Sequence, residues 1–185
     1  MAPFVILGTP RSRTAWLAKF LSYGDVTCHH EPSIHFRSLN DLAAMLRRSG
    51  VGASDSMMTL LWPEILFLAP NVRMVVVLRP MEEVLDSVER MGVSVPLVRS
   101  LLARIVGAVE EIKRSGFEAL FVDFADLEKE EVCSRVFEHA TGLPFDRDWW
   151  LSWRNVNVQT PVGQRIVEAA RNAAGIRAVY AMGGA

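Results

Sequence analysis

A polar loop with two arginines and three hydroxyl residues follows the first apolar run of the chain. Residues 8–14 read Gly-Thr-Pro-Arg-Ser-Arg-Thr and lie between the apolar run Phe4–Leu7 and a segment, residues 14–23, with apolar side chains at helical spacing. A loop between a buried strand and a helix presents backbone N–H groups that no helical hydrogen bond uses, and such groups bind anions. Arginine and hydroxyl side chains add further donors. The loop therefore predicts a site for a phosphate or sulfate group.

A second candidate anion site follows the strongest strand pattern of the chain. Arg79 comes directly after the run Arg73–Leu78, and Ser87 lies eight residues further along, in an expected helix. The guanidinium group is a planar fork of donors that matches the oxygens of a phosphate dianion, and Ser87 is placed to direct its hydroxyl toward the same group. The alternative is that Arg79 pairs with Glu82 or Glu83 and that Ser87 lies on the surface.

Two proton-accepting side chains, His30 and Glu31, follow a short apolar segment at residues 25–28. Ligands of open α/β sheets bind at the carboxyl ends of the strands, so we expect these side chains near the anion sites. Histidine has an ordinary pKa near neutrality, and a carboxylate also serves as a general base. The alternative interpretation is a polar turn in which Glu31 forms an ordinary ion pair.

Short apolar runs alternate with longer segments of helical period, which predicts an α/β fold. We expect strands at residues 4–8, 25–28, 51–56, 73–78 and 119–124. We expect helices at residues 14–23, 39–49 (with Asn40 as a cap), 57–68, from 80 onward, 97–114 and 129–141. Strands joined by helices of this length imply right-handed crossovers, and hence a three-layer sandwich with a mainly parallel sheet and helices on both faces.

Three further features have two interpretations each. Asp55, between Ser54 and Ser56, either contacts a ligand or caps the helix that follows. The Trp-Trp-x-x-Trp sequence of residues 149–153 either cradles a flat ligand or anchors its segment to the core. The apolar stripe of a helical tail from about residue 161 either packs on the sheet or forms the seam of a homodimer.

Length and composition indicate an ordinary globular protein. The chain has 185 residues, of which 50% are hydrophobic and 22% charged, so we expect one domain over residues 1–185 with a C-terminal helical tail. With 20 basic and 21 acidic residues the net charge is −1, which argues against nucleic acid or a membrane surface as a partner. No secretory signal, disulfide framework or membrane-length apolar run is present in the sequence, so we expect a soluble cytoplasmic protein.

A histidine-rich segment around Cys28 is the nearest approach to a metal motif. His29, His30 and His35 lie close to it in the sequence, yet no second cluster supplies partners at ligand spacing. We therefore expect no metal.

The motifs, taken in order, resemble those of the sulfotransferases. Residues 9–16, Thr-Pro-Arg-Ser-Arg-Thr-Ala-Trp, are similar to that family's phosphosulfate-binding loop, T-x-[KR]-S-G-T-T-W. The Arg79-x7-Ser87 spacing resembles the family's site for the 3′-phosphate of its sulfate donor, 3′-phosphoadenylyl sulfate (PAPS). Residues 121–127, Phe-Val-Asp-Phe-Ala-Asp-Leu, are similar to the family's strand that ends in Y-E-D-L. The resemblance spans residues 4–146.

This resemblance implies a P-loop NTPase-like fold, PAPS as co-substrate without a metal, and a small-molecule or carbohydrate acceptor. The residues that it places on the co-substrate are Thr9, Arg11, Ser12, Arg13, Thr14, Trp16, Arg79 and Ser87. Arg11 would stabilise charge on the bridging oxygen. Because a bacterial branch of the family has its catalytic glutamate in a Glu-Pro pair, Glu31 is the first candidate for the base and His30 the second. Trp16 is either a neighbour of the purine or part of the core.

The sequence departs from the family pattern at three points. Arg13 stands where the family has glycine, Ala15 replaces a hydroxyl residue, and the C-terminal glycine-and-lysine motif that closes over the nucleotide has no counterpart.

Two alternative functions stay open. A divergent nucleotide or small-molecule kinase would need Mg²⁺, and the P-loop lysine is absent. A non-catalytic nucleotide-binding protein would retain the loop without the chemistry.

Overall fold

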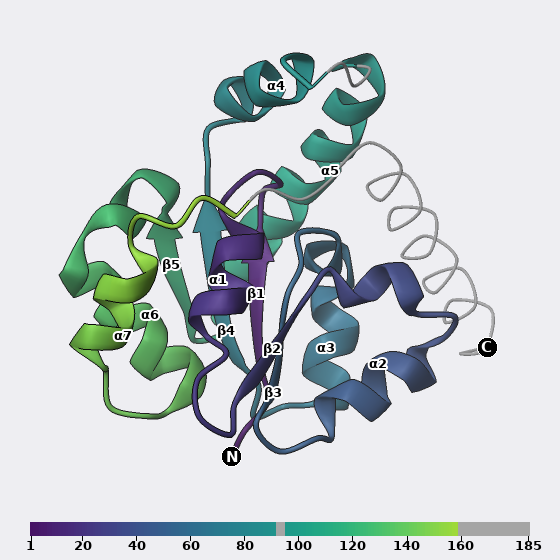
Figure 1. The fold of residues 1–185 in the computed structure, drawn as a ribbon. Coiled ribbons are helices and arrows are strands. Elements are labelled where there is room, and N and C mark those ends of the chain that lie inside the picture. Colours follow the sequence, from purple (N-terminus) through teal and green to yellow (C-terminus); the bar gives the residue numbers. More distant parts are fainter. Residues whose placement is uncertain (92–94, 159–185) are drawn as a thin grey trace.

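The central element of the computed structural model, which describes residues 1–91 and 95–158, is an all-parallel sheet of five strands (Figure 1). The strand order is β2-β3-β1-β4-β5. The strands are β1 (Phe4–Gly8), β2 (Thr27–His30), β3 (Val51–Ser54), β4 (Arg73–Leu78) and β5 (Ala119–Asp123). β1 is buried along its whole length and lies between β3 and β4, which explains why its residues form one continuous apolar run.

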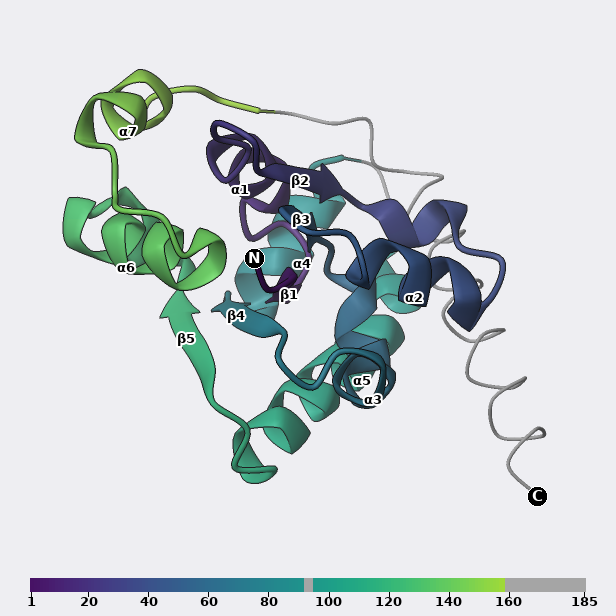
Figure 2. The same ribbon diagram turned by 90° about the horizontal axis from the view of Figure 1, so that it is seen from below.

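Helices cover both faces of this sheet. One face carries α1 (Thr14–Phe20), α6 (Glu130–Thr141) and α7 (Arg147–Trp153), and the other carries α2 (Leu39–Leu46), α3 (Trp62–Leu68) and α5 (Val95–Arg114). Figure 2 shows α6 and α7 on one side of the strands and α3 and α5 on the other. α4 (Met81–Glu89) continues from β4 beyond the carboxyl edge of the sheet and packs on α5.

Three short 3₁₀ helices follow strands at the carboxyl edge. They are η1 (Pro32–His35), η2 (Met57–Leu61) and η3 (Phe124–Glu128), which come after β2, β3 and β5. Each therefore reaches the edge of the sheet at which the loop of residues 8–14 connects β1 to α1.

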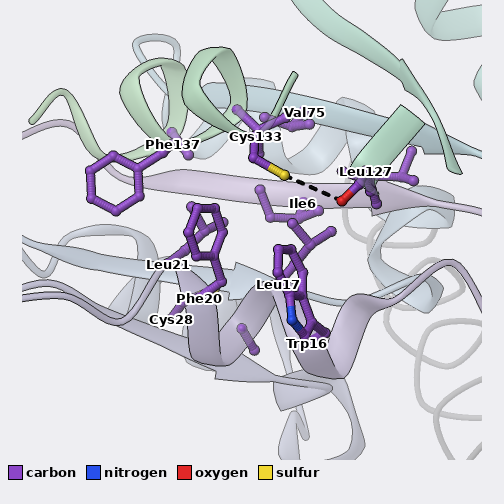
Figure 3. Close-up of a cluster of buried hydrophobic side chains, with 14 of the residues drawn as sticks. Ile6, Trp16, Leu17, Phe20, Leu21, Cys28, Val75, Leu127, Cys133 and Phe137 are labelled. Carbon is purple, nitrogen blue, oxygen red and sulfur yellow. Dashed lines mark hydrogen bonds between the residues drawn. The ribbon is translucent and has the colours of Figure 1, made fainter. Parts of the chain in front are cut away.

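The core between the sheet and α1, α6 and α7 is rich in aromatic side chains (Figure 3). Trp16 stacks on Phe20 with ring centroids 4.8 Å apart, and Phe20 in turn contacts Phe137. The two cysteines, Cys28 and Cys133, are buried and unbridged in this layer. Burial raises the pKa of the Cys133 thiol to about 11, so it packs as a small apolar group.

The expected α/β fold with a parallel sheet and helices on both faces is confirmed, while several element boundaries were wrong. The second strand runs over Thr27–His30, and the helix expected at residues 57–68 divides into η2 and α3. α2 is capped by Ser38, not by Asn40, since Ser38 and Asp41 form a capping box. α7 was not expected. The tail from residue 161 lies outside the described residues.

Among the described residues, no helix combines the length and the apolar character that crossing a membrane requires.

Candidate functional site

The loop of residues 8–14 has a backbone conformation that few sequences adopt. Gly8 has a φ of 127°, and a side chain there would overlap the carbonyl oxygen of Val77, so only glycine fits. Arg11 and Arg13 follow in the left-handed region, with φ of 63° and 59°. Within the described residues, the backbone N–H groups of residues 11–16 donate no hydrogen bond. The loop thus presents a series of unused donors beside two arginines, as an anion site requires.

Thr9 and Ser12 attach this loop to the end of β4. The Thr9 hydroxyl accepts a 3.0 Å hydrogen bond from the backbone N–H of Arg79 and lies 2.9 Å from the Ser12 hydroxyl. The Arg79 guanidinium donates from Nη1 to the carbonyl of Arg11 at 2.7 Å. Both hydroxyl residues are buried. The loop and Arg79 therefore form one hydrogen-bonded unit, although they are far apart in the sequence.

Arg11, Arg79 and Ser87 come together at one side of the loop. Arg11 Nε donates to the Ser87 hydroxyl at 3.3 Å. Burial and the neighbouring charge of Arg79 lower the pKa of Arg11, while the charge of Glu31 raises it. Arg79 also pairs with Glu83 at 3.2 Å, which is the ion pair that the sequence offered as the alternative. Two cations held this close favour the binding of a multiply charged anion.

The Arg13 side chain contacts η3. Its guanidinium forms a 2.8 Å ion pair with Glu128 and donates to the Leu127 carbonyl at 3.4 Å. It also lies 5.7 Å from the centre of the Phe124 ring, above which Arg79 lies at 4.2 Å. The side chain that replaces the glycine of the sulfotransferase pattern is therefore held by the segment after β5.

Trp16 lies in the core directly behind the loop. It is 4% exposed, and its indole N–H donates to the carbonyl of Trp153 at 2.9 Å. Trp149 likewise donates to the carbonyl of Phe20, and Trp150 is buried. In this arrangement the tryptophans of residues 149–153 join α7 to α1.

The candidate bases His30 and Glu31 lie at the same edge of the sheet as the loop. His30 Nε2 is 3.4 Å from the hydroxyl of Thr14 and 3.7 Å from Glu31 Oε1. Glu31 has a left-handed φ of 49°, and its backbone N–H donates to the carbonyl of Ser54 at 3.1 Å. Both side chains are partly buried. The structure thus brings both candidate bases next to the first turn of α1.

Asp55 and Thr59 are fully buried polar residues beneath these segments. Asp55 caps η2, since Oδ1 accepts hydrogen bonds from the N–H groups of Met57 and Met58, and Oδ2 accepts one from Ser33. Burial raises the pKa of its carboxyl group, an effect that the hydrogen bonds oppose. Thr59 bonds to the backbone of Gly8. Thr59 was missed from the sequence because a threonine within an apolar run carries no recognisable signal.

In the part of the chain that the structure describes, no three His, Cys, Asp or Glu side chains gather as metal ligands would.

No protein-family model and no curated protein sequence matches the chain. Solved structures do match. The sulfotransferase domain of the olefin synthase from Synechococcus PCC 7002 superposes with a TM-score of 0.61 at 13% identity, over 93% of this chain and 94% of that one. The sulfotransferase domain from the curacin biosynthetic pathway gives 0.56 at 12% identity, over 94% and 96%. The YorR protein of Bacillus subtilis in complex with phosphorylated GDP gives 0.53 at 12% identity, over 72% and 92%. The chain therefore has a sulfotransferase-like α/β fold.

Proposed function

We propose that the chain binds PAPS and transfers its sulfuryl group to a hydroxyl or amine of a small-molecule or carbohydrate acceptor. The observation that carries this proposal is the hydrogen-bonded unit of the loop and Arg79, with Arg11 and Ser87 beside it. A nucleotide with phosphates on both its 5′ and 3′ positions needs two anion sites in contact, and this unit offers them. The fold shared with two sulfotransferase domains supports the same co-substrate.

Each residue of the unit has a defined part in binding. The free N–H groups of the loop, with the hydroxyls of Ser12 and Thr14, hold the 5′-phosphosulfate. Arg79 exchanges its contact with Glu83 for the 3′-phosphate, and Ser87 adds a hydroxyl donor. Trp16, which donates to Trp153 behind the loop, and Arg13, which pairs with Glu128, support the loop from below and from the side of η3.

The chemical step needs one base and one cation. Glu31, or His30 beside it, takes the proton of the acceptor as the acceptor oxygen or nitrogen forms its bond to sulfur. The bond between sulfur and the bridging oxygen breaks, and the electron pair leaves with 3′,5′-ADP. Arg11 stabilises the negative charge that develops on the bridging oxygen. Glu31 is the first candidate because it precedes Pro32, as the catalytic glutamate does in a bacterial branch of the sulfotransferases, and His30 is the second.

A thermal-shift series with 3′,5′-ADP, 5′-ADP and ATP plus Mg²⁺ tests the co-substrate. A ligand at about 100 times its Kd adds roughly 2.7 kcal/mol to the free energy of unfolding, which raises the Tm by several degrees. We expect the largest shift with 3′,5′-ADP and its loss in Arg79→Ala. A shift with ATP and Mg²⁺ alone would instead indicate a nucleotide kinase, and no shift with any of the three would overturn the proposal.

Release of 3′,5′-ADP from PAPS, in the presence of a panel of phenols, alcohols, amines and sugars, tests the transfer. We expect Glu31→Gln to abolish most of this turnover, because a general base contributes ~100-fold or more to the rate. The same variant should bind 3′,5′-ADP within about twofold of the unaltered protein, because the base contacts the acceptor and not the nucleotide. Unchanged turnover in Glu31→Gln would assign the base to His30. Binding without turnover by the unaltered protein would indicate a non-catalytic nucleotide-binding protein.

A further inference from the structure

We infer that Asp55 and Thr59 are positioning residues with separate tasks: Asp55 orients the base segment at Glu31, and Thr59 orients the start of the phosphate-binding loop. Both lie in the short segment after β3, and both side chains are 0% exposed. As roles in transfer, these tasks rest on the proposed function; as contacts between segments, they do not.

Asp55 holds the backbone on the C-terminal side of Glu31 in place. Its Oδ2 accepts the N–H of Ser33 at 2.9 Å, and Ser33 is the second residue after Glu31. On the N-terminal side, the N–H of Glu31 itself donates to the carbonyl of Ser54, the neighbour of Asp55. Glu31 has a left-handed φ, which a glutamate rarely adopts unless its surroundings impose it. Residues 54 and 55 therefore hold Glu31 from both sides.

A carboxylate suits this position because both of its oxygens accept hydrogen bonds. Oδ1 accepts from Met57 and Met58 of η2, while Oδ2 accepts from Ser33 of η1. An asparagine has one carbonyl oxygen, and its NH₂ group would face a backbone N–H on one of the two sides. Two N–H groups of η2 and one of η1 donate to Asp55, so the asparagine oxygen should stay on η2. Asp55→Asn should therefore release η1 while it preserves the volume of the side chain.

Thr59 determines the orientation of the Gly8 peptide. Its hydroxyl oxygen accepts the N–H of Gly8 at 2.8 Å and donates to the carbonyl of Gly8 at 3.2 Å. Gly8 is the last residue of β1, and its φ of 127° directs the chain into the loop. Thr59→Val keeps the shape of the side chain and removes both hydrogen bonds, which leaves a buried N–H unpaired.

The two tasks predict different defects, one in turnover and the other in nucleotide affinity. Asp55→Asn should lower turnover about tenfold or more and leave the affinity for 3′,5′-ADP within about twofold. Thr59→Val should weaken 3′,5′-ADP binding about tenfold, and Thr59→Ser should restore it. Asp55→Asn should cause no further loss of turnover in a Glu31→Gln background, because it acts through Glu31.

Hydrogen–deuterium exchange of the full chain, read by mass spectrometry, tests the positioning itself without any turnover. We expect faster exchange in residues 31–36 alone for Asp55→Asn. For Thr59→Val we expect faster exchange at the N–H groups of Gly8 and Thr9, the two in the loop that donate hydrogen bonds. Thr141→Val is the matched control for Thr59, since Thr141 is also fully buried and its hydroxyl also makes two hydrogen bonds, to Phe137 and Leu143, in a different turn. Asp146→Asn is the control for Asp55, because Asp146 caps α7.

The results separate the inference from the proposed function. Equal exchange of both segments in both variants, or a simple loss of stability like that of Thr141→Val, would overturn the inference. Segment-specific exchange in a protein that binds no 3′,5′-ADP would support the positioning contacts and overturn the proposed function. Segment-specific exchange together with the separate losses of turnover and binding supports both. If Asp55→Asn does not fold, Ser33→Ala, a change at the residue whose N–H donates to Asp55, should give a smaller effect in the same segment.

Discussion

The hydroxyl of Thr9 accepts the backbone N–H of Arg79 at 3.0 Å and so joins the loop of residues 8–14 to the end of β4, 70 residues further along the chain. The same hydroxyl lies 2.9 Å from that of Ser12. One buried side chain therefore determines the spacing between the two anion sites proposed for the nucleotide. A change of this side chain should therefore alter the positions of the loop and of Arg79 together.

Thr9→Val should weaken the preference for a 3′-phosphate. The change leaves the part-buried N–H of Arg79 without its partner and leaves only the bond to the Arg11 carbonyl between Arg79 and the loop. The affinity for 3′,5′-ADP should therefore fall about tenfold and that for 5′-ADP less. Isothermal titration calorimetry measures both. Thr9→Ser retains the hydroxyl and serves as the control; an equal loss for the two ligands would contradict the proposed spacing role.

Glu83→Gln should strengthen the binding of a 3′-phosphate. Glu83 is exposed and competes for Arg79 through a 3.2 Å ion pair. Exposed pairs of this kind contribute up to about 1 kcal/mol, so the affinity for 3′,5′-ADP should rise by roughly twofold to fivefold at low salt. Glu82→Gln, one residue earlier, is the matched control. Unchanged affinity in both variants would show that Arg79 does not have to leave Glu83 when the nucleotide binds.

Arg13→Gly should be more stable than Arg13→Ala. Both variants lose the ion pair with Glu128, yet only alanine still has a β-carbon at a φ of 59°. The left-handed conformation costs a residue other than glycine about 1 kcal/mol, and urea denaturation should show a difference of this size. Glycine and alanine variants of equal stability would mean that the loop relaxes once the arginine is removed.

Two glycines should respond to alanine with opposite signs. A side chain on Gly52 would overlap the buried ring of Phe4, so Gly52→Ala should destabilise by about 1–3 kcal/mol through overpacking. Gly107 lies in α5 with open space around it, and Gly107→Ala should stabilise by about 0.5–1 kcal/mol through helix propensity. Thermal and urea denaturation measure both; a loss of stability in Gly107→Ala would contradict the open environment.

The hydrogen bond between Tyr23 and Asp146 should make stability depend on pH at both extremes. The N–H of Trp149 and then the Tyr23 hydroxyl lower the pKa of Asp146, so its contribution is present above the ordinary carboxylate pKa and is lost as the pH falls below about 4. The same bond raises the pKa of Tyr23, so its contribution is lost as the pH rises above about 10. Tyr23→Phe should therefore reduce Tm most between these limits. A constant difference across the pH range would contradict this linkage.

The sequence by itself determined the fold class and the order of the motifs. The unbroken apolar runs of β1 and β4 predicted buried parallel strands, because such strands are covered on both faces and need no polar side. The loop after β1 was predicted as an anion site because a loop between a buried strand and a helix leaves backbone N–H groups unpaired. His30 and Glu31 were expected near it because ligands of open α/β sheets bind at the carboxyl ends of the strands. These are local patterns, and local patterns are what a single sequence records.

Only the tertiary structure shows what these side chains contact. Arg79 contacts both Glu83 and the loop, Asp55 caps η2 and also reaches Ser33, and Thr59 supports Gly8 from 51 residues away. The direction of Arg13 depends on Glu128, which lies 115 residues away. The pairing of strands in the order β2-β3-β1-β4-β5 creates these contacts. Their energies depend on distances across the fold, and no spacing along the chain contains that information.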